Sequence, residues 1–234
     1  SCSTQYELTA MSNQPAESRN DTRTRLLEAA LEAFGSRDYD GVSTREIVEM
    51  AGANISAISY HFENKQGLYH ATVSYLSETL KAGMAEQLES LEAWMKQATA
   101  EDCAEKVCQF LEHYFEHILL GEVGKHSPGI IFREQNRPTE AFQILFENLL
   151  APMHKALAQL VARYRGQSAT EPQVLYMVHT LLGQTIIFRI AQPTLLKILK
   201  QKQYSQADIN AIKEQLRCQC RAILDTQTIP IHSE

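Results

Sequence analysis

The sequence predicts an all-α protein. Leu, Ala, Glu and Gln recur at spacings of three and four residues, and the alternation typical of strands is nearly absent. Glycine and proline are sparse, at 10 and 7 residues, and stand mostly between the periodic segments. We therefore expect helices at about residues 21–36, 44–51, 55–61, 65–95, 102–120, 129–135, 138–165, 171–191, 194–201 and 205–226.

Composition narrows the class of protein. With 44% hydrophobic and 21% charged residues, the chain can bury an ordinary globular core. Its net charge of −6 argues against a protein that coats nucleic acid indiscriminately, but a local basic patch would still suffice for DNA binding. Residues 1–10 lack the basic and apolar segments of a secretory signal, and no apolar run reaches the ~18 residues of a membrane span. We expect a cytoplasmic protein that does not bind a membrane, with its five cysteines reduced.

Residues 21–68 contain the pattern of a helix-turn-helix. The first helix places an apolar stripe on one face, formed by Leu26, Leu27, Ala30, Leu31 and Phe34. Ser43 and Glu46 have the spacing of a capping box, so a short helix is expected from Thr44 to a stop at Gly52. A second short helix follows, with Ile58 and Phe62 facing inward. Two short helices joined by a tight glycine-containing turn are typical of this DNA-binding unit.

Polar residues occupy the predicted DNA-facing side of this unit. Thr44 and Arg45 lie where a helix N-terminus attracts phosphate. Asn54, Ser56 and Ser59 are small enough to approach base edges, and Tyr60, His61 and Lys65 can donate to phosphate oxygens. The alternative is a pair of ordinary surface helices, since residues 12–70 carry six basic and nine acidic side chains. Against that, the basic residues Arg23, Arg25, Arg45 and Lys65 fall near the predicted DNA face.

The segments Thr44-Arg45-Glu46-Ile47, Ala51-Gly52 and Ile58 to Leu68 resemble the signature of the TetR/AcrR repressors over about residues 20–70. The resemblance implies DNA contacts at Thr44, Arg45, Ser56, Ser59, Tyr60, His61 and Lys65. It also places Ile55 and Ala57 where members of the family often read bases. Ser59 departs from the pattern, because many members have tyrosine there, and this departure bears on the operator sequence.

The rest of the chain is expected to form a sensing and dimerising body. In the family, the helix that we expect at 65–95 transmits ligand binding to the head; a straight helix of this length would be a rod of ~45 Å. The segments at 132–142 and 151–154, with Gly183-Gln184 and Ile187-Phe188-Arg189, resemble the C-terminal domain of regulators of cephalosporin and chloramphenicol sensitivity. Helix 171–191 has apolar residues around much of its circumference, so we expect it to pair with helix 205–226 in a two-fold homodimer.

Three domains are expected: a disordered extension at 1–19, the DNA-binding head at 20–68 and the body at 69–228. Many aromatic and histidine side chains of the body are expected in its core, and a subset could line an effector pocket. The candidates for that pocket are His113, His117, Arg133, Phe142 and His179.

Metal and catalytic sites are not expected. His113 and His117 have a metal-compatible i, i+4 spacing, but no third ligand can be named, and a pocket or surface pair fits them better. Cys218 and Cys220 should face different sides of one helix, and Cys103 and Cys108 form no recognisable site. No acyl-transfer or nucleotide motif occurs.

The sequence therefore predicts no enzyme and no cofactor. It predicts a dimeric repressor that binds palindromic operators and is released from them by a small-molecule effector. The alternative is a DNA-binding regulator whose body binds a protein partner.

Overall fold

The computed structural model describes residues 16–88 and 90–226, and every regular element within them is helical. This confirms the predicted all-α class. The chain divides between Tyr75 and Leu76 into two compact units, which we call the head and the body. Residues 1–15, most of the extension for which disorder was expected, lie outside the described part of the chain.

The head is built from α1 (Ala16–Ser36), α2 (Thr44–Met50), α3 (Ser56–Phe62) and the first part of α4 (Lys65–Gly83). Helix α1 begins at Ala16, five residues before the expected Asp21. All residues predicted to face inward are buried, and this group consists of Leu26, Leu27, Ala30, Leu31, Phe34, Ile47, Val48, Ala51, Ile58 and Phe62. The helical period of the sequence therefore identified the core of the head.

Local contacts set the turns of the head. Ser43 caps α2 by accepting a hydrogen bond from the Glu46 N–H at 3.2 Å, but the expected reciprocal bond is replaced by a contact between the Glu46 carboxylate and Arg37. The capping box is therefore only half formed, because the Glu46 side chain faces Arg37. Gly52, between α2 and α3, has a φ of 59°, which glycine adopts without strain.

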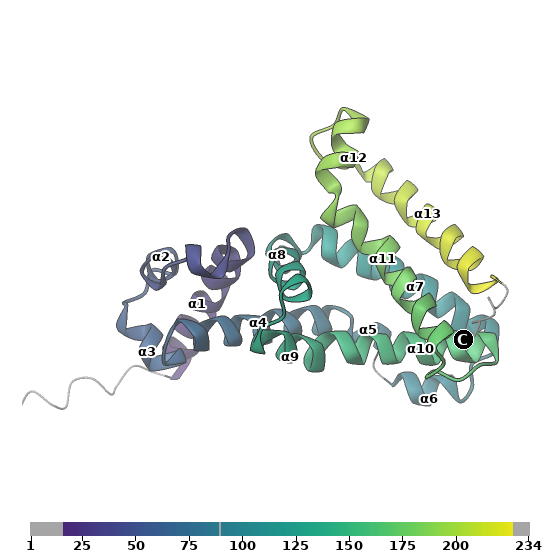
Figure 1. The fold of residues 1–234 in the computed structure, drawn as a ribbon, viewed down its shortest axis with the longest axis horizontal. Helices are drawn as coiled ribbons and strands as arrows, with labels where there is room; N and C mark the ends of the chain where they lie inside the picture. Colours follow the sequence, from purple (N-terminus) through teal and green to yellow (C-terminus); the bar gives the residue numbers. More distant parts are fainter. Residues whose placement is uncertain (1–15, 89, 227–234) are drawn as a thin grey trace, which may run out of the picture. The chain divides into compact units, whose positions relative to one another are not determined.

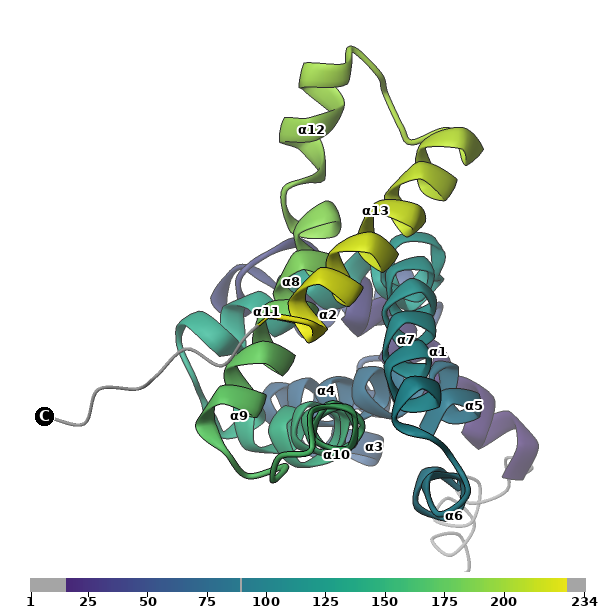
Figure 2. The ribbon, with the colours of Figure 1, turned by 90° about the vertical axis from the view of Figure 1, so that its right-hand side faces the viewer.

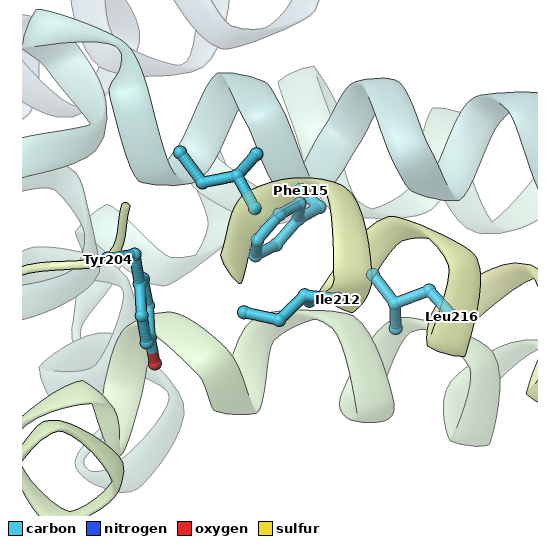
Figure 3. Packing of buried hydrophobic residues seen from close by; sticks show 5 residues of the cluster. Phe115, Tyr204, Ile212 and Leu216 are labelled. Carbon is cyan, nitrogen blue, oxygen red and sulfur yellow. The ribbon is translucent and has the colours of Figure 1, made fainter. Parts of the chain in front are cut away.

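In the body, α7 (Ala100–Leu120) packs against α8 (Glu122–Asn136), α10 (Ala151–Arg165), α11 (Pro172–Ile190) and α13 (Gln206–Leu224) (Figures 1 and 2). Helix α12 (Gln192–Leu199) connects α11 to α13 at the far end of this bundle (Figure 2). A buried cluster holds this end together, with Phe115 of α7 between Ile212 and Leu216 of α13 and Tyr204 of the preceding loop (Figure 3). The Tyr204 hydroxyl donates to the Phe188 carbonyl at 3.3 Å.

The prediction of a single helix over residues 65–95 is wrong. Helix α4 ends at Gly83, and two short helices follow, α5 (Ala85–Leu88) and α6 (Leu91–Met95). The His117 ring lies where a side chain at position 83 would be, because a Cβ added to Gly83 would stand 2.1 Å from the His117 Cε1. The His113 Nε2–H also donates to the Gly83 carbonyl at 2.7 Å, and Ser90 adopts a left-handed φ of 56°. Side chains of α7 thus stabilise a helix end that the periodicity does not reveal.

The helix expected at 129–135 is longer than predicted, because α8 runs from Glu122 through Gly124 and Pro128. Pro128 has no N–H to donate to the Gly124 carbonyl, four residues earlier. The Arg189 side chain supplies this bond, with Nε donating to Gly124 at 3.2 Å and Nη2 to the Lys125 carbonyl at 2.9 Å. A distant arginine therefore allows the helix to continue through its proline.

The helix expected at 138–165 contains one irregular turn. Helix α9 (Glu140–Leu145) leads into a π-helical turn, η2 (Phe146–Leu150), and then into α10. The Ala151 N–H bonds to the Phe146 carbonyl, five residues earlier, immediately before Pro152. The widened turn accommodates a residue that cannot donate to the preceding turn.

No single helix of the described chain is long and apolar enough to cross a membrane. Helices α11 and α12 reach that length and apolar character together, but the chain bends by 62° between them.

Candidate functional site

The outer face of α3 is exposed and uncharged. Ile55 and Tyr60 are 52% and 67% exposed, and Asn54, Ser56 and Ser59 are exposed beside them. Asn54 precedes the helix, where its Oδ1 accepts from the Ser56 N–H at 3.2 Å and so orders the first turn. Inward-facing Ile58 and Phe62 fix the rotation of α3, so the other side of the helix must face outward. Asn54, Ile55, Ser56 and Ser59 present amide and hydroxyl groups beside an apolar side chain, which suits base edges and the thymine methyl group. The Tyr60 hydroxyl can donate to a phosphate oxygen.

Three further candidates of the DNA-binding set are partly covered. Thr44, Ala57 and His61 are half-buried. The His61 ring lies between Tyr60 and Phe62, with ring centroids 4.7 and 5.9 Å away. Burial first, and then the positive charge of Arg23, lower the pKa of His61. His61 is therefore neutral near pH 7 and offers one N–H donor, which suits a single phosphate contact.

The basic candidates differ in how firmly they are held. The Arg45 side chain is 86% exposed and lies 3.8 Å from Glu49. The Lys65 Nζ stands 4.3 Å from the centre of the Tyr39 ring, within a cluster in which Tyr39 also contacts Phe34 and Tyr69. This cation–π contact restricts the lysine amine to one side of the head. The sequence reasoning missed Tyr39, since no motif marks a ring that meets Lys65 only after folding.

The effector candidates begin with a histidine pair on α7. The His113 and His117 rings are stacked, with centroids 6.3 Å apart, beside the end of α4 at Gly83. The His117 Nε2 is buried without a hydrogen-bond partner. Burial first, and then the neighbouring His113, lower the pKa of His117. A buried polar atom without a partner is an available contact for a polar group of a ligand.

The other effector candidates lie on three further helices. Arg133 is half-buried on α8, and Phe142 of α9 stacks against Phe146 at 6.0 Å. His179 of α11 is within 3.4 Å of His154 Nε2, a partner that the sequence reasoning did not name. These contacts do not gather the five candidates into one cavity.

A surface hollow of about 500 Å³ lies elsewhere in the body, lined by Ala93, Trp94, Gln97, Ala98 and Asp102. None of the effector candidates lines it. Within residues 16–88 and 90–226, no three metal-ligating side chains are grouped as a metal site would require.

Family models match both parts of the chain. The model described as bacterial regulatory proteins of the tetR family matches residues 26–72, which span the helix-turn-helix. The model described as the C-terminal domain of the HTH-type transcriptional dual regulator CecR matches residues 103–226, more than half of the chain. The chain belongs to the TetR family of transcriptional regulators. It therefore binds DNA through its helix-turn-helix and is not an enzyme, as the sequence predicted.

Individual proteins agree with this assignment. The chain is 26% identical to the HTH-type transcriptional dual regulator CecR of Shigella flexneri over 86% of its own length and 91% of that protein. It is 36% identical to the transcriptional regulator TtgR of Pseudomonas putida over 30% of its length and 33% of that protein, so this second likeness is partial.

Solved structures show the same fold. The hemolysin II transcriptional regulator HlyIIR has a TM-score of 0.57 at 17% identity, over 85% of this chain and 98% of that one. A transcriptional regulator from Rhodococcus sp. Rha1 has a TM-score of 0.59 at 18% identity, over 86% of this chain and 95% of that one.

Proposed function

We propose that this regulator is a homodimeric repressor that binds a palindromic operator through α3 and is released by a small molecule bound in the body. The exposed, uncharged outer face of α3 is the observation that carries the DNA-binding part. A helix presenting such a face, preceded by a capped supporting helix, has the geometry of a recognition helix in a major groove.

We assign base reading to Asn54, Ile55, Ser56, Ala57 and Ser59, which lie at and near the N-terminus of α3. We assign phosphate contacts to Thr44, Arg45, Tyr60, His61 and Lys65. Since α3 carries no Arg or Lys on its outer face, discrimination among operators depends on hydroxyl and amide hydrogen bonds and on apolar contacts. The affinity for DNA then depends strongly on the basic side chains beside the helix, Arg45 and Lys65.

Selection of operators in vitro with the purified full chain tests this assignment. The chain should enrich one sequence motif, and Ser59→Asp should abolish binding to it, because a carboxylate on the outer face of α3 repels the DNA backbone. Gln135→Glu adds the same charge to an exposed position of α8 and should leave binding unchanged. Equal binding by Ser59→Asp and Gln135→Glu would mean that α3 is not the recognition helix.

The exposed face of α11 supports a dimer. Leu175, Tyr176, Ile187 and Ile190 are 42–65% exposed, an unusual number of large apolar side chains along one helix. Helix α13 turns a largely uncharged face outward, with Glu214 its single charged residue among Asn210, Ala211, Gln215, Cys218, Gln219 and Ala222. Two helices from each of two chains would bury these faces in a four-helix interface, with the two-fold symmetry that a palindromic operator requires.

We place the effector beside His113 and His117, where a buried nitrogen has no partner. Arg133, Phe142 and His179 are separate candidates for effector contacts, on α8, α9 and α11. The alternative is a body that binds a protein partner. Screening small molecules for release of the chain from its selected operator separates the two, since a partner-controlled regulator would be released by none of them.

A further inference from the structure

Two thiols from distant parts of the chain meet inside the body. Cys108 of α7 and Cys220 of α13 are 112 residues apart, and their sulfurs are 3.1 Å from each other. The side chains are 1% and 0% exposed. A disulfide bond is about 2.05 Å long, so an approach of about 1 Å would join the two sulfurs.

The packing of α13 against α7 holds the pair in register. Leu216 and Leu224 are fully buried one turn before and one turn after Cys220. Four ion pairs tie the same two helices together: Lys213 to Glu116, Arg217 to both Glu105 and Glu112, and Arg221 to Glu101. The two sulfurs are therefore apposed by an extended interface.

The surroundings distinguish the two thiols. The hydrogen bond with Cys220 lowers the pKa of Cys108 against the opposing effect of burial, and Arg217 and Arg221 add to the lowering. The same hydrogen bond, and then burial, raise the pKa of Cys220. Cys108 thus ionises first, and the thiolate is the reactive form of cysteine.

We propose that Cys108 and Cys220 are a reversible dithiol–disulfide pair that a small hydroperoxide oxidises. The Cys108 thiolate attacks one oxygen of hydrogen peroxide, the O–O bond breaks, and water leaves after protonation of the departing hydroxide. The Cys220 sulfur then attacks the Cys108 sulfenic acid, the S–O bond breaks, and a second water leaves with the Cys220 proton. Two thiols lose two electrons and two protons, and one hydrogen peroxide becomes two waters. A dithiol reductant reverses the change.

This site lies within the body and is independent of the proposed DNA contacts. Its product would be a covalent link between α7 and α13, which are now joined by packing and ion pairs. Because both sulfurs are buried, a small peroxide should react faster than a bulky aromatic disulfide.

The test uses the purified full chain, reduced, freed of reductant and treated with hydrogen peroxide. We expect a mass lower by about 2 Da and the loss of two titratable thiols, both restored by dithiothreitol. Peptide mapping without reduction should find Cys108 linked to Cys220 within one chain. The oxidised chain should melt about 5–10 °C higher, because the bond closes a long loop.

Each partner has a control on its own helix. Cys103→Ser changes a buried cysteine of α7, and Cys218→Ser an exposed one of α13; both variants should still form the link. Cys108→Ser and Cys220→Ala should lose it. A mapped bond involving Cys103 or Cys218, a bond between chains, or an unchanged thiol count in the oxidised wild type would overturn the proposal.

Discussion

At the scale of single residues, each basic side chain of the head has a different environment. Lys65 is held against the Tyr39 ring, Arg45 projects into solvent, and Arg37 is occupied by Glu46 and the Gly41 carbonyl. These three side chains carry the same charge but make different contacts. Arg37 stabilises the supporting helix, whereas we propose Lys65 and Arg45 as phosphate contacts.

Lys65→Ala should weaken binding to all DNA sequences alike and reduce the slope of log affinity against log salt by about one unit, as expected for one lost phosphate contact. Ser59→Ala should instead change the preference among operator variants. Lys155→Ala removes an exposed charge of α10 and should change neither. Affinity measurements at several salt concentrations check this, and an unchanged slope in Lys65→Ala would remove Lys65 from the phosphate contacts.

His117 should make stability depend on pH. Its pKa in the folded chain is below the ordinary 6.5, mainly because of burial and then because of His113. Protonation therefore favours the unfolded state, so this contribution is present above the unfolded-state pKa and is lost as pH falls through the folded-state value.

Urea unfolding at pH 7.5 and pH 5.5 measures this effect. His117→Gln should lose less stability on acidification than the wild type, and His126→Gln serves as a control that removes a different histidine. Equal losses in the wild type and His117→Gln would show that His117 does not contribute.

At the scale of helices, the attachment of α13 depends on both apolar packing and ion pairs. Arg217 donates to Glu112 at 2.6 Å and to Glu105 at 2.7 and 2.8 Å. The Glu112 side chain is 18% exposed, so the loss of its partner would leave a partly buried charge without compensation.

Arg217→Met should therefore lower the free energy of unfolding by about 1–3 kcal/mol. Lys155→Met, at an exposed position of α10, should change it by less than about 0.5 kcal/mol. Denaturant unfolding of both variants gives the comparison. If the two variants were equally stable, the ion pairs would contribute nothing beyond the packing.

At the scale of the whole molecule, the proposed homodimer, with one recognition helix in each subunit and a two-fold interface, predicts two equivalent half-sites. Footprinting on the selected operator should show a near-palindrome with its half-sites about one helical turn, ~34 Å, apart on one DNA face. Protection of a single asymmetric half-site would contradict the dimeric arrangement.

The proposed release makes effector and operator mutual antagonists. Helix α4 includes residues of both units and ends beside His113 and His117, so a ligand at the proposed site would act on a helix that continues into the head. Saturating operator should weaken effector binding by the same factor by which the effector weakens operator binding, about 5–150-fold for a switch of this kind.

Calorimetric titration of the releasing compound, with and without operator, measures this coupling. Equal affinities in the two titrations would show that the compound is not the inducer. The partner-protein alternative would then gain support if every binding compound behaved in this way.

The sequence by itself determined the helical class, the buried face of the head, the helix-turn-helix and the outward residues of α3. These depend on interactions between residues three or four apart and on local caps, which a linear pattern records directly. Even there, the pattern could not show that the Glu46 carboxylate would contact Arg37 in place of the Ser43 backbone N–H.

The tertiary structure alone decided the features that join distant residues. His117 ends α4 at Gly83, Arg189 supports the helix around Pro128, and Cys108 meets Cys220. The same reason explains why the effector residues could be proposed individually but not assembled, since their helices approach one another only through packing. Such contacts depend on how helices cross and rotate against each other, and the period of a sequence does not specify these quantities.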